Sequence, residues 1–314
     1  MKKRILTGII MGLILLPVVI VPELITVFEL LIILFSVLAS FEVLNMFDKE
    51  KKLPLGVKIL CVVLTLMLYS SIVNNFAICE NTLVCRLLSC FRFQLDMFLT
   101  LTIIFLCVMS CMLFVPHFDA GDAGRCFTEI MYIGITFATF TVLRAYGIRF
   151  IIYLLIITVA TDIFALVFGL NFGKHKMAPT ISPKKSWEGA IGGTAVALII
   201  GFLFLYFYPY FAPLFHDGEQ ISFFAGVFNY EIFSEPGLIF FMILLTLCMS
   251  ICSQIGDLVA SKLKRTYGIK DFSNIFPGHG GILDRFDSTL FASAIFLLFL
   301  QFESIINPAL FGVL

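Results

Sequence analysis

Residues 261–288 of this 314-residue chain read SKLKRTYGIKDFSNIFPGHGGILDRFDS, and a long apolar run borders them on each side. The stretch holds five cations and three carboxylates, although only 13% of the chain is charged. Ionisable groups beside membrane-length apolar runs usually mark a functional site. The mixture of cations, carboxylates and a glycine-rich turn predicts a site for a phosphate group and a divalent metal.

The chain as a whole is too apolar for a soluble globular protein. Hydrophobic residues make up 60% of it and the mean hydropathy is +1.05, whereas about 45–50% is usual in soluble domains. Apolar runs of about 20 residues are long enough to cross a bilayer. They predict an all-α integral membrane protein with about nine transmembrane helices, near residues 5–21, 24–46, 57–78, 98–115, 127–143, 150–169, 189–211, 237–259 and 289–310.

The placement of lysine and arginine predicts how these spans are oriented. If the N-terminus is cytoplasmic, 17 of the 21 cations fall in cytoplasmic segments, and the outer loop 212–236 carries four carboxylates and no cation. Cytoplasmic loops of membrane proteins carry the excess of lysine and arginine. We therefore expect a cytoplasmic N-terminus in the cell membrane, with the polar site at the cytoplasmic membrane face.

A second polar cluster spans residues 173–189 and reads GKHKMAPTISPKKSWEG. Two prolines stiffen it, and Ser186 is placed to cap the helix that follows. Lys184 and Lys185 beside a helix N-terminus suit an anion. A basic loop that only follows the charge rule for cytoplasmic segments is the alternative interpretation.

Carboxylates at the ends of apolar runs are the candidate metal ligands. Asp257 shares a helix face with Ser261 and Lys264, because these residues are spaced at i, i+4 and i+7. Asp257 and Asp284 lie 27 residues apart on either side of one loop. Magnesium prefers hard oxygen ligands and keeps several waters, so these two carboxylates are the predicted Mg²⁺ ligands.

Two further residues have more than one interpretation. Asp162 is isolated within an apolar run, where it either lines a polar cavity or forms a structural pair. His279 lies between glycines, and a hydrogen-bonding role is expected there because imidazole suits softer metals than magnesium.

These residues carry a resemblance to a known family. From Ser261 to Asp287 the chain resembles the signature of phosphatidate cytidylyltransferases, the CDP-diacylglycerol synthases of bacteria. Residues 174–189 resemble the second motif of that family, and residues 4–8 resemble its usual start. After Asp162 the chain departs from the family pattern, because Ile163, Phe164, Ala165 and Leu166 stand where the family has a small residue followed by Ala-Tyr.

The resemblance implies transfer of CMP from CTP to phosphatidic acid, which gives CDP-diacylglycerol and pyrophosphate for phospholipid biosynthesis. It implies a Mg²⁺ requirement, with a second, monovalent cation left open, a homodimer, and no nucleic acid as partner. The implied catalytic residues are Asp257, Asp284, Lys264, Arg285 and Asp287. The implied substrate-binding residues are Ser182, Lys184, Lys185, Ser261, Arg265, Lys270, Asp271, His279, Gly280, Gly281 and Asp162.

Residues 1–314 are expected to form a single polytopic domain. Its first 120 residues would serve as scaffold or dimer contact, and 121–314 would hold the catalytic helices and loops. Three alternatives stay open: a membrane transferase acting on another lipid phosphate, an inactive relative, and an anion transporter. A transporter predicts polar residues spread through several spans, whereas here they gather at one membrane face.

Overall fold

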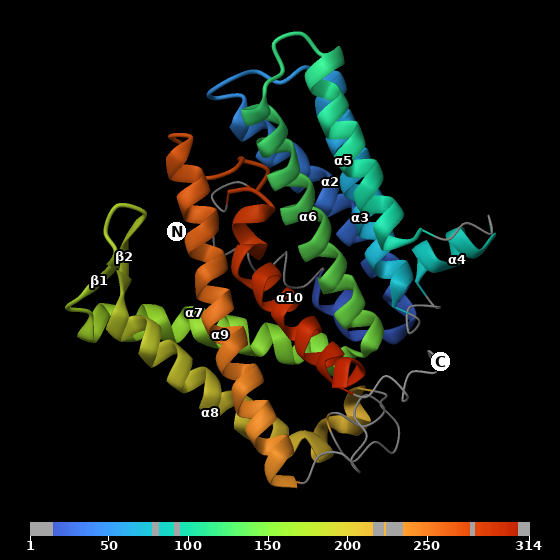
Figure 1. The fold of residues 1–314 in the computed structure, drawn as a ribbon. Coiled ribbons are helices and arrows are strands. Elements are labelled where there is room, and N and C mark those ends of the chain that lie inside the picture. Colours follow the sequence, from blue (N-terminus) through green and yellow to red (C-terminus); the bar gives the residue numbers. More distant parts are fainter. Residues whose placement is uncertain are drawn as a thin grey trace. The chain divides into compact units, whose positions relative to one another are not determined.

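The structure, a computed structural model, describes residues 15–76, 82–90, 95–215, 223, 235–276 and 280–306. It is helical with one small hairpin (Figure 1). The helices are α2 (Ile25–Phe47), α3 (Leu55–Asn75), α4 (Leu83–Cys90), α5 (Met97–Phe114), α6 (Ala120–Tyr146), α7 (Ile148–Phe172), α8 (Trp187–Phe211), α9 (Glu235–Thr266) and α10 (Leu283–Ile306), with short 3₁₀ helices at Pro22–Leu24 and Ala212–Phe215. The hairpin pairs β1 (Lys176–Ala178) with β2 (Ser182–Ser186).

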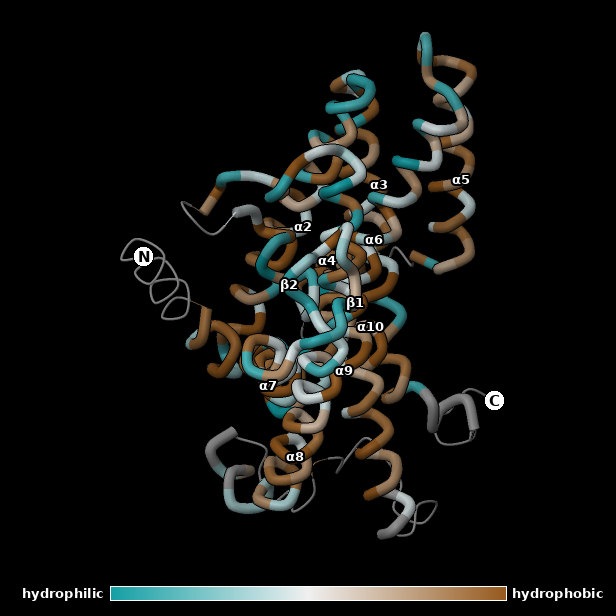
Figure 2. The backbone as a smooth tube through the Cα atoms, turned by 90° about the vertical axis from the view of Figure 1, so that its left-hand side faces the viewer, coloured by the Kyte–Doolittle hydropathy of each residue, from teal (hydrophilic) through white to brown (hydrophobic). Residues whose placement is uncertain are grey.

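The helices confirm an all-α membrane protein with several spans. Within the described residues, seven are long and apolar enough to cross a bilayer: Pro22–Phe47, Leu55–Asn75, Met97–Phe114, Ala120–Tyr146, Ile148–Phe172, Trp187–Tyr210 and Ile239–Thr266. Most of the expected span 5–21 and the end of 289–310 lie outside the described residues, so the count of nine stays a prediction. In Figure 2 the helices are mostly coloured hydrophobic and the hairpin hydrophilic.

The chain divides into two compact units. Unit 1 contains Met1–Tyr146 and Lys262–Phe286, and unit 2 contains Gly147–Ser261 and Asp287–Leu314. Helices α9 and α10 therefore each contribute residues to both units. The expected division into scaffold and catalytic parts stays a prediction.

In unit 1, α2, α3 and α6 pack against one another, and α5 packs against α3 and α6. The Tyr69 hydroxyl on α3 lies 2.8 Å from the Thr141 hydroxyl on α6. Gly134 lets Leu68 approach α6, because a Cβ there would lie 3.0 Å from that side chain. Apolar packing and paired hydroxyls thus hold α3 against α6 without leaving a buried donor unsatisfied at this point.

An ionic cluster joins the loop after α2 to the start of α6. The Lys51 ammonium lies 2.7 Å from Asp119 and also pairs with Asp122, which is buried. Arg125 reaches Glu50 at 2.8 Å and Asp122 at 3.0 Å. The hydrogen bond from Lys51 lowers the pKa of Asp119 below its usual value and raises the pKa of Lys51.

In unit 2, α7 and α8 pack backbone against backbone. A Cβ on Gly189 would lie 2.6 Å from the carbonyl oxygen of Ala165, and one on Gly193 would lie 2.7 Å from that of Thr161. Real Cβ atoms do not approach other atoms so closely, so glycine at these two positions is what permits the contact. The close contact brings Asp162 on α7 beside the first turns of α8.

A ladder of hydrogen bonds ties α9 to α7 and α8 within unit 2. The Tyr153 hydroxyl lies 2.5 Å from Thr246. One helical turn further along α9, Ser250 receives a hydrogen bond from Thr161 at 2.9 Å and contacts Thr194 at 3.0 Å. Each of these polar groups has a partner, as a protein interior requires. The ladder leads towards the polar end of α9 where Asp257 lies.

Candidate active site

The second polar cluster folds as the β1–β2 hairpin, and its base is held by Glu188. That carboxylate accepts hydrogen bonds from the backbone N–H groups of Lys174 and His175 and lies 2.6 Å from Nδ1 of His175. Ser186 caps α8 as predicted, because its Oγ accepts from the N–H of Gly189 at 3.2 Å. The hairpin therefore has a fixed orientation relative to the start of α8.

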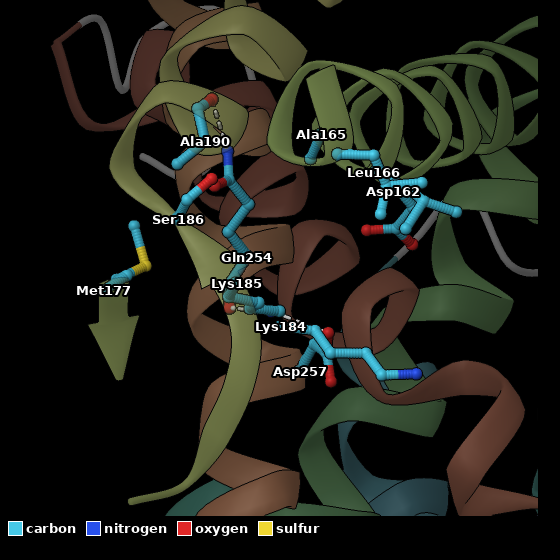
Figure 3. Close-up of a pocket in the computed structure, with 11 residues that line it drawn as sticks. Asp162, Ala165, Leu166, Met177, Lys184, Lys185, Ser186, Ala190, Gln254 and Asp257 are labelled. Carbon is cyan, nitrogen blue, oxygen red and sulfur yellow. Dashed lines mark hydrogen bonds and ion pairs between the residues drawn. The ribbon is translucent and has the colours of Figure 1, made fainter. Parts of the chain in front are cut away.

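Strand β2 places two lysines on a cavity of about 240 Å³ in unit 2 (Figure 3). The cavity is lined by four predicted site residues that come from three different elements: Asp162, Lys184, Lys185 and Asp257. Leu166, Leu170 and Met177 supply apolar walls. A cavity with apolar walls and a few convergent polar groups is the usual form of a small-molecule site.

The central contact of this cavity is an ion pair between Lys185 and Asp257. The Lys185 ammonium lies 2.6 Å from Oδ2 of Asp257, and the two side chains are 26% and 33% exposed. The same ammonium donates to the backbone carbonyl of Gln254 at 3.5 Å. Ser261 donates to the other oxygen of Asp257 at 3.3 Å, which confirms that the two residues share a helix face. A cation and a partly exposed carboxylate are thus presented together to one cavity.

Asp162 lies in the same cavity and has its own partner. Its Oδ2 accepts a hydrogen bond from the Ser288 hydroxyl at 3.1 Å. The two interpretations of Asp162 from the sequence are therefore compatible, because the residue both lines a polar cavity and has a hydrogen-bond partner. The altered residues that follow it contribute Ala165 and Leu166 to the cavity wall.

In unit 1, the loop between α9 and α10 closes around Asp284. The Lys264 ammonium lies 2.6 Å from Oδ1, and the side chains of this pair are 11% and 2% exposed. The N–H groups of Phe272 and Gly281 donate to Oδ2 at 2.8 and 2.9 Å. Both oxygens of Asp284 are therefore occupied by groups of the loop and of α9.

The remaining loop residues are described one by one. Gly280 has a φ of +85°, which favours glycine, and pairs with Phe276 through two backbone hydrogen bonds. Lys270, Asp271 and Arg285 are exposed, as is Arg265, which donates to the carbonyl of Ile269 at 3.1 Å. Asp287 is buried, its carboxylate accepts from the N–H of Ser288, and Ser182 is half-buried at the start of β2. His279 lies outside the described residues.

Comparison with known protein families assigns the chain to one of them. A sequence model of the cytidylyltransferase family matches residues 2–303. The chain belongs to the cytidylyltransferase family. The family resemblance from the sequence motifs is thereby confirmed.

Curated relatives of this cytidylyltransferase family member include proteins from three Staphylococcus species. Proteins named phosphatidate cytidylyltransferase from Staphylococcus haemolyticus and Staphylococcus aureus are each 39% identical to it over 175 residues, and one from Staphylococcus epidermidis is 37% identical over the same length. The matched region covers 56% of this chain and 58% of each relative. It therefore spans less than two thirds of the relatives' length.

The sequence motifs of this family member did not identify three residues at the two clusters. Gln254 donates to Thr194 at 2.9 Å and lines the cavity. Ser288 holds Asp162, and Glu42 on α2 accepts hydrogen bonds from the loop between α9 and α10. Gln254 lies three residues before Asp257, so helical spacing placed it on the same face. A carboxylate inside an apolar run was the available signal for Glu42.

Proposed function

We propose that the chain transfers CMP from CTP to phosphatidic acid, giving CDP-diacylglycerol and pyrophosphate. The observation that carries the proposal is the Lys185–Asp257 pair, which faces a cavity that Asp162 also lines. Family membership and the relatives named phosphatidate cytidylyltransferase support the same reaction.

The chemistry requires two polyanions to be brought together. The phosphate monoester of phosphatidic acid is already an anion near neutral pH, so the reaction does not depend on a strong base. The reaction instead requires cations and N–H groups that offset the charge on the phosphates and on the leaving pyrophosphate. Lys184 and Lys185 would hold a phosphate at the cavity, where apolar side chains beside them suit the adjoining part of a lipid.

The proposed cofactor is Mg²⁺, which when bound would draw charge from phosphate oxygens. Asp257 fits this ion if Lys185 releases Oδ2, because its carboxylate is partly exposed and faces a cavity with room for water and phosphate. Asp284 fits it only if Lys264 releases Oδ1, since both oxygens have partners. Among the described residues no cluster of three metal-ligating side chains is present.

The other proposed roles follow the signature. Lys264 and Arg285, with Arg265 and Lys270, would offset charge on the triphosphate. We also propose that the site faces the cytoplasm, where CTP is available, and that the protein acts as a homodimer in the cell membrane.

A matched pair of lysine variants tests the proposal. We would assay transfer of labelled CMP from CTP to phosphatidic acid with Mg²⁺ in detergent, using wild type, Lys185→Gln and Lys176→Gln. Lys176 lies on β1 of the same hairpin, is exposed and is not among the cavity residues. We expect product from wild type and from Lys176→Gln, and at least about a hundredfold lower kcat/KM for Lys185→Gln. Well-folded wild type without product would refute the proposed reaction.

A further inference from the structure

Glu42, near the end of α2, is a buried carboxylate far from the signature in sequence. The residue is only 4% exposed to solvent. It accepts three hydrogen bonds, from the Ser273 hydroxyl at 2.5 Å and from the N–H groups of Ile282 at 2.9 Å and Leu283 at 3.0 Å. All three donors belong to the loop after α9 or to the start of α10.

Two of these donors are the N–H groups that a helix start leaves without intrahelical partners. A carboxylate placed there satisfies the donors and also interacts favourably with the positive end of the helix dipole. Glu42 thus caps α10 from a helix about 240 residues earlier in the chain. Asp284, in the first turn of α10, accepts from the next N–H group upstream, that of Gly281.

The fit between Glu42 and the loop is close. A Cβ built on Gly281 would lie 2.7 Å from the carboxylate carbon of Glu42. Any larger residue at this position would therefore push the loop away from α2 or displace the carboxylate. The Gly281 of the signature is explained here by the acid that it packs against.

Aromatic contacts join both ends of the same loop to the rest of unit 1. Phe286 in the first turn of α10 lies 5.7 Å from Phe35 on α2, between ring centroids, and 6.0 Å from Phe140 on α6. Tyr267, just after α9, lies 5.2 Å from Phe47. Such ring pairs stabilise a contact beyond their buried area. The loop is therefore supported at its start, its end and its middle by residues of α2.

We propose that Glu42 is a positioning residue for the loop between α9 and α10. It acts through the N–H groups of Ile282 and Leu283 and through Ser273, and it does not contact the substrates. This inference rests on the proposed function, in which Lys264 at the end of α9 and Asp284 at the start of α10 flank the loop and serve the reaction. Because a catalytic group must be held within a fraction of an ångström, loosening the cap displaces Asp284 and lowers turnover. The helices before residue 120 thereby have a part in catalysis in addition to any role as scaffold.

The same helix provides a matched control. Glu29 on α2 is also fully buried and accepts hydrogen bonds from the N–H groups of Leu83 and Val84, at the start of α4. It makes the same kind of contact with a helix outside the signature. Glu29→Gln and Glu42→Gln each replace a buried carboxylate that accepts two backbone N–H groups at the start of a helix.

The experiment measures three quantities for wild type, Glu42→Gln, Glu42→Asp, Ser273→Ala and Glu29→Gln. These are the thermal unfolding midpoint, amide hydrogen exchange in peptides covering 267–290 and 82–90, and kcat with KM for each substrate. We expect Glu42→Gln to speed exchange in 267–290 and to lower kcat about tenfold or more, with KM for phosphatidic acid within about twofold. Glu29→Gln should speed exchange only in 82–90 and retain its kcat.

Two outcomes would overturn the inference. One is a Glu42→Gln protein with normal exchange in 267–290. The other is faster exchange there with a kcat equal to that of Glu29→Gln. If Glu42→Gln does not fold, Ser273→Ala removes a single contact and must show the same pattern in weaker form. Absence of activity in wild type would refute the proposed reaction. The comparison of hydrogen exchange in 267–290 between wild type and Glu42→Gln would still show whether Glu42 anchors the loop.

Discussion

Replacing Asp257 and Asp284 by asparagine removes one negative charge from each of two lysine–aspartate pairs while keeping the side-chain shape. Both pairs have a nitrogen–oxygen distance of 2.6 Å, yet their surroundings differ. Asp257 is 33% exposed, whereas Asp284 is 2% exposed and also accepts two backbone hydrogen bonds. The structure therefore predicts the same effect on activity and different effects on stability.

The magnitudes follow from exposure. Solvent screens the pair of Lys185 with Asp257, so its loss should change the free energy of unfolding by only about 0.2–1 kcal/mol. Removing one partner from a buried pair costs about 3–5 kcal/mol, because the other charge stays buried without compensation. Lys264 would be that charge, and it is 11% exposed in its side chain. The free energy of unfolding of Asp284→Asn should thus be about 2–5 kcal/mol lower than that of Asp257→Asn.

The assay compares CMP transfer and thermal unfolding on the same detergent preparations of wild type and both variants. We expect each variant to retain less than about a tenth of wild-type activity, a barrier increase of at least about 1.4 kcal/mol. Only Asp284→Asn should unfold at a clearly lower temperature. Equal loss of stability in the two variants would refute the reasoning from exposure, and near-normal activity of Asp257→Asn would refute its proposed place in the site.

Three smaller predictions concern the supports of the fold. Ser186→Ala removes the cap of α8 and should lower the free energy of unfolding by about 1 kcal/mol, and an unchanged denaturation midpoint would contradict this. Gly193→Ala forces α7 and α8 apart and should destabilise by about 1–3 kcal/mol. Gly124→Ala, with open space around it on α6, should not destabilise and is expected to raise the free energy of unfolding by about 0.5–1 kcal/mol in the same assay. Lys51→Ala should raise the pKa of Asp119 towards its ordinary value in an NMR titration, because the ammonium that lowers it is removed. In wild type the stabilisation by this pair is present above the ordinary pKa of an aspartate and is lost as pH falls through the lowered pKa. An Asp119 titration that is the same in wild type and Lys51→Ala would contradict this prediction.

Local patterns predicted the features that depend on neighbours in sequence. The cap by Ser186 and the shared face of Asp257 and Ser261 follow from helical spacing alone, and the structure confirms both. The long helices follow from apolar runs in the same way. The pairing of Lys185 with Asp257 bridges 72 residues, and no periodicity within one element specifies it.

The β1–β2 hairpin shows where composition was a poor guide. Two prolines predicted only a stiff loop, since proline cannot donate to a strand ladder. Both strands of a two-stranded hairpin are edge strands, however, so Pro183 within β2 is tolerated there. The hairpin then depends on Glu188, whose contacts with Lys174 and His175 form only after the chain turns back.

Asp284 and Glu42 show the limits of reading a site from its motif. The motif predicted Asp284 as a Mg²⁺ ligand, and nothing in the motif indicated that the N–H groups of Phe272 and Gly281 converge on the same carboxylate. Glu42 contacts that loop across 231 to 241 residues. Its role is a property of the tertiary structure, and an acid in an apolar run was the sole hint.

The contact between Glu42 and Gly281 has a consequence for how the protein can change over time. Gly281 in the loop packs directly against Glu42 on α2, so a larger residue at one position needs a smaller one at the other. Substitutions at the two positions are therefore coupled. A loop transplanted from a distant relative would need that relative's α2 to accompany it. We expect chimaeras joined between these segments to fail unless both partners of the contact come from the same parent, and paired replacement to restore them.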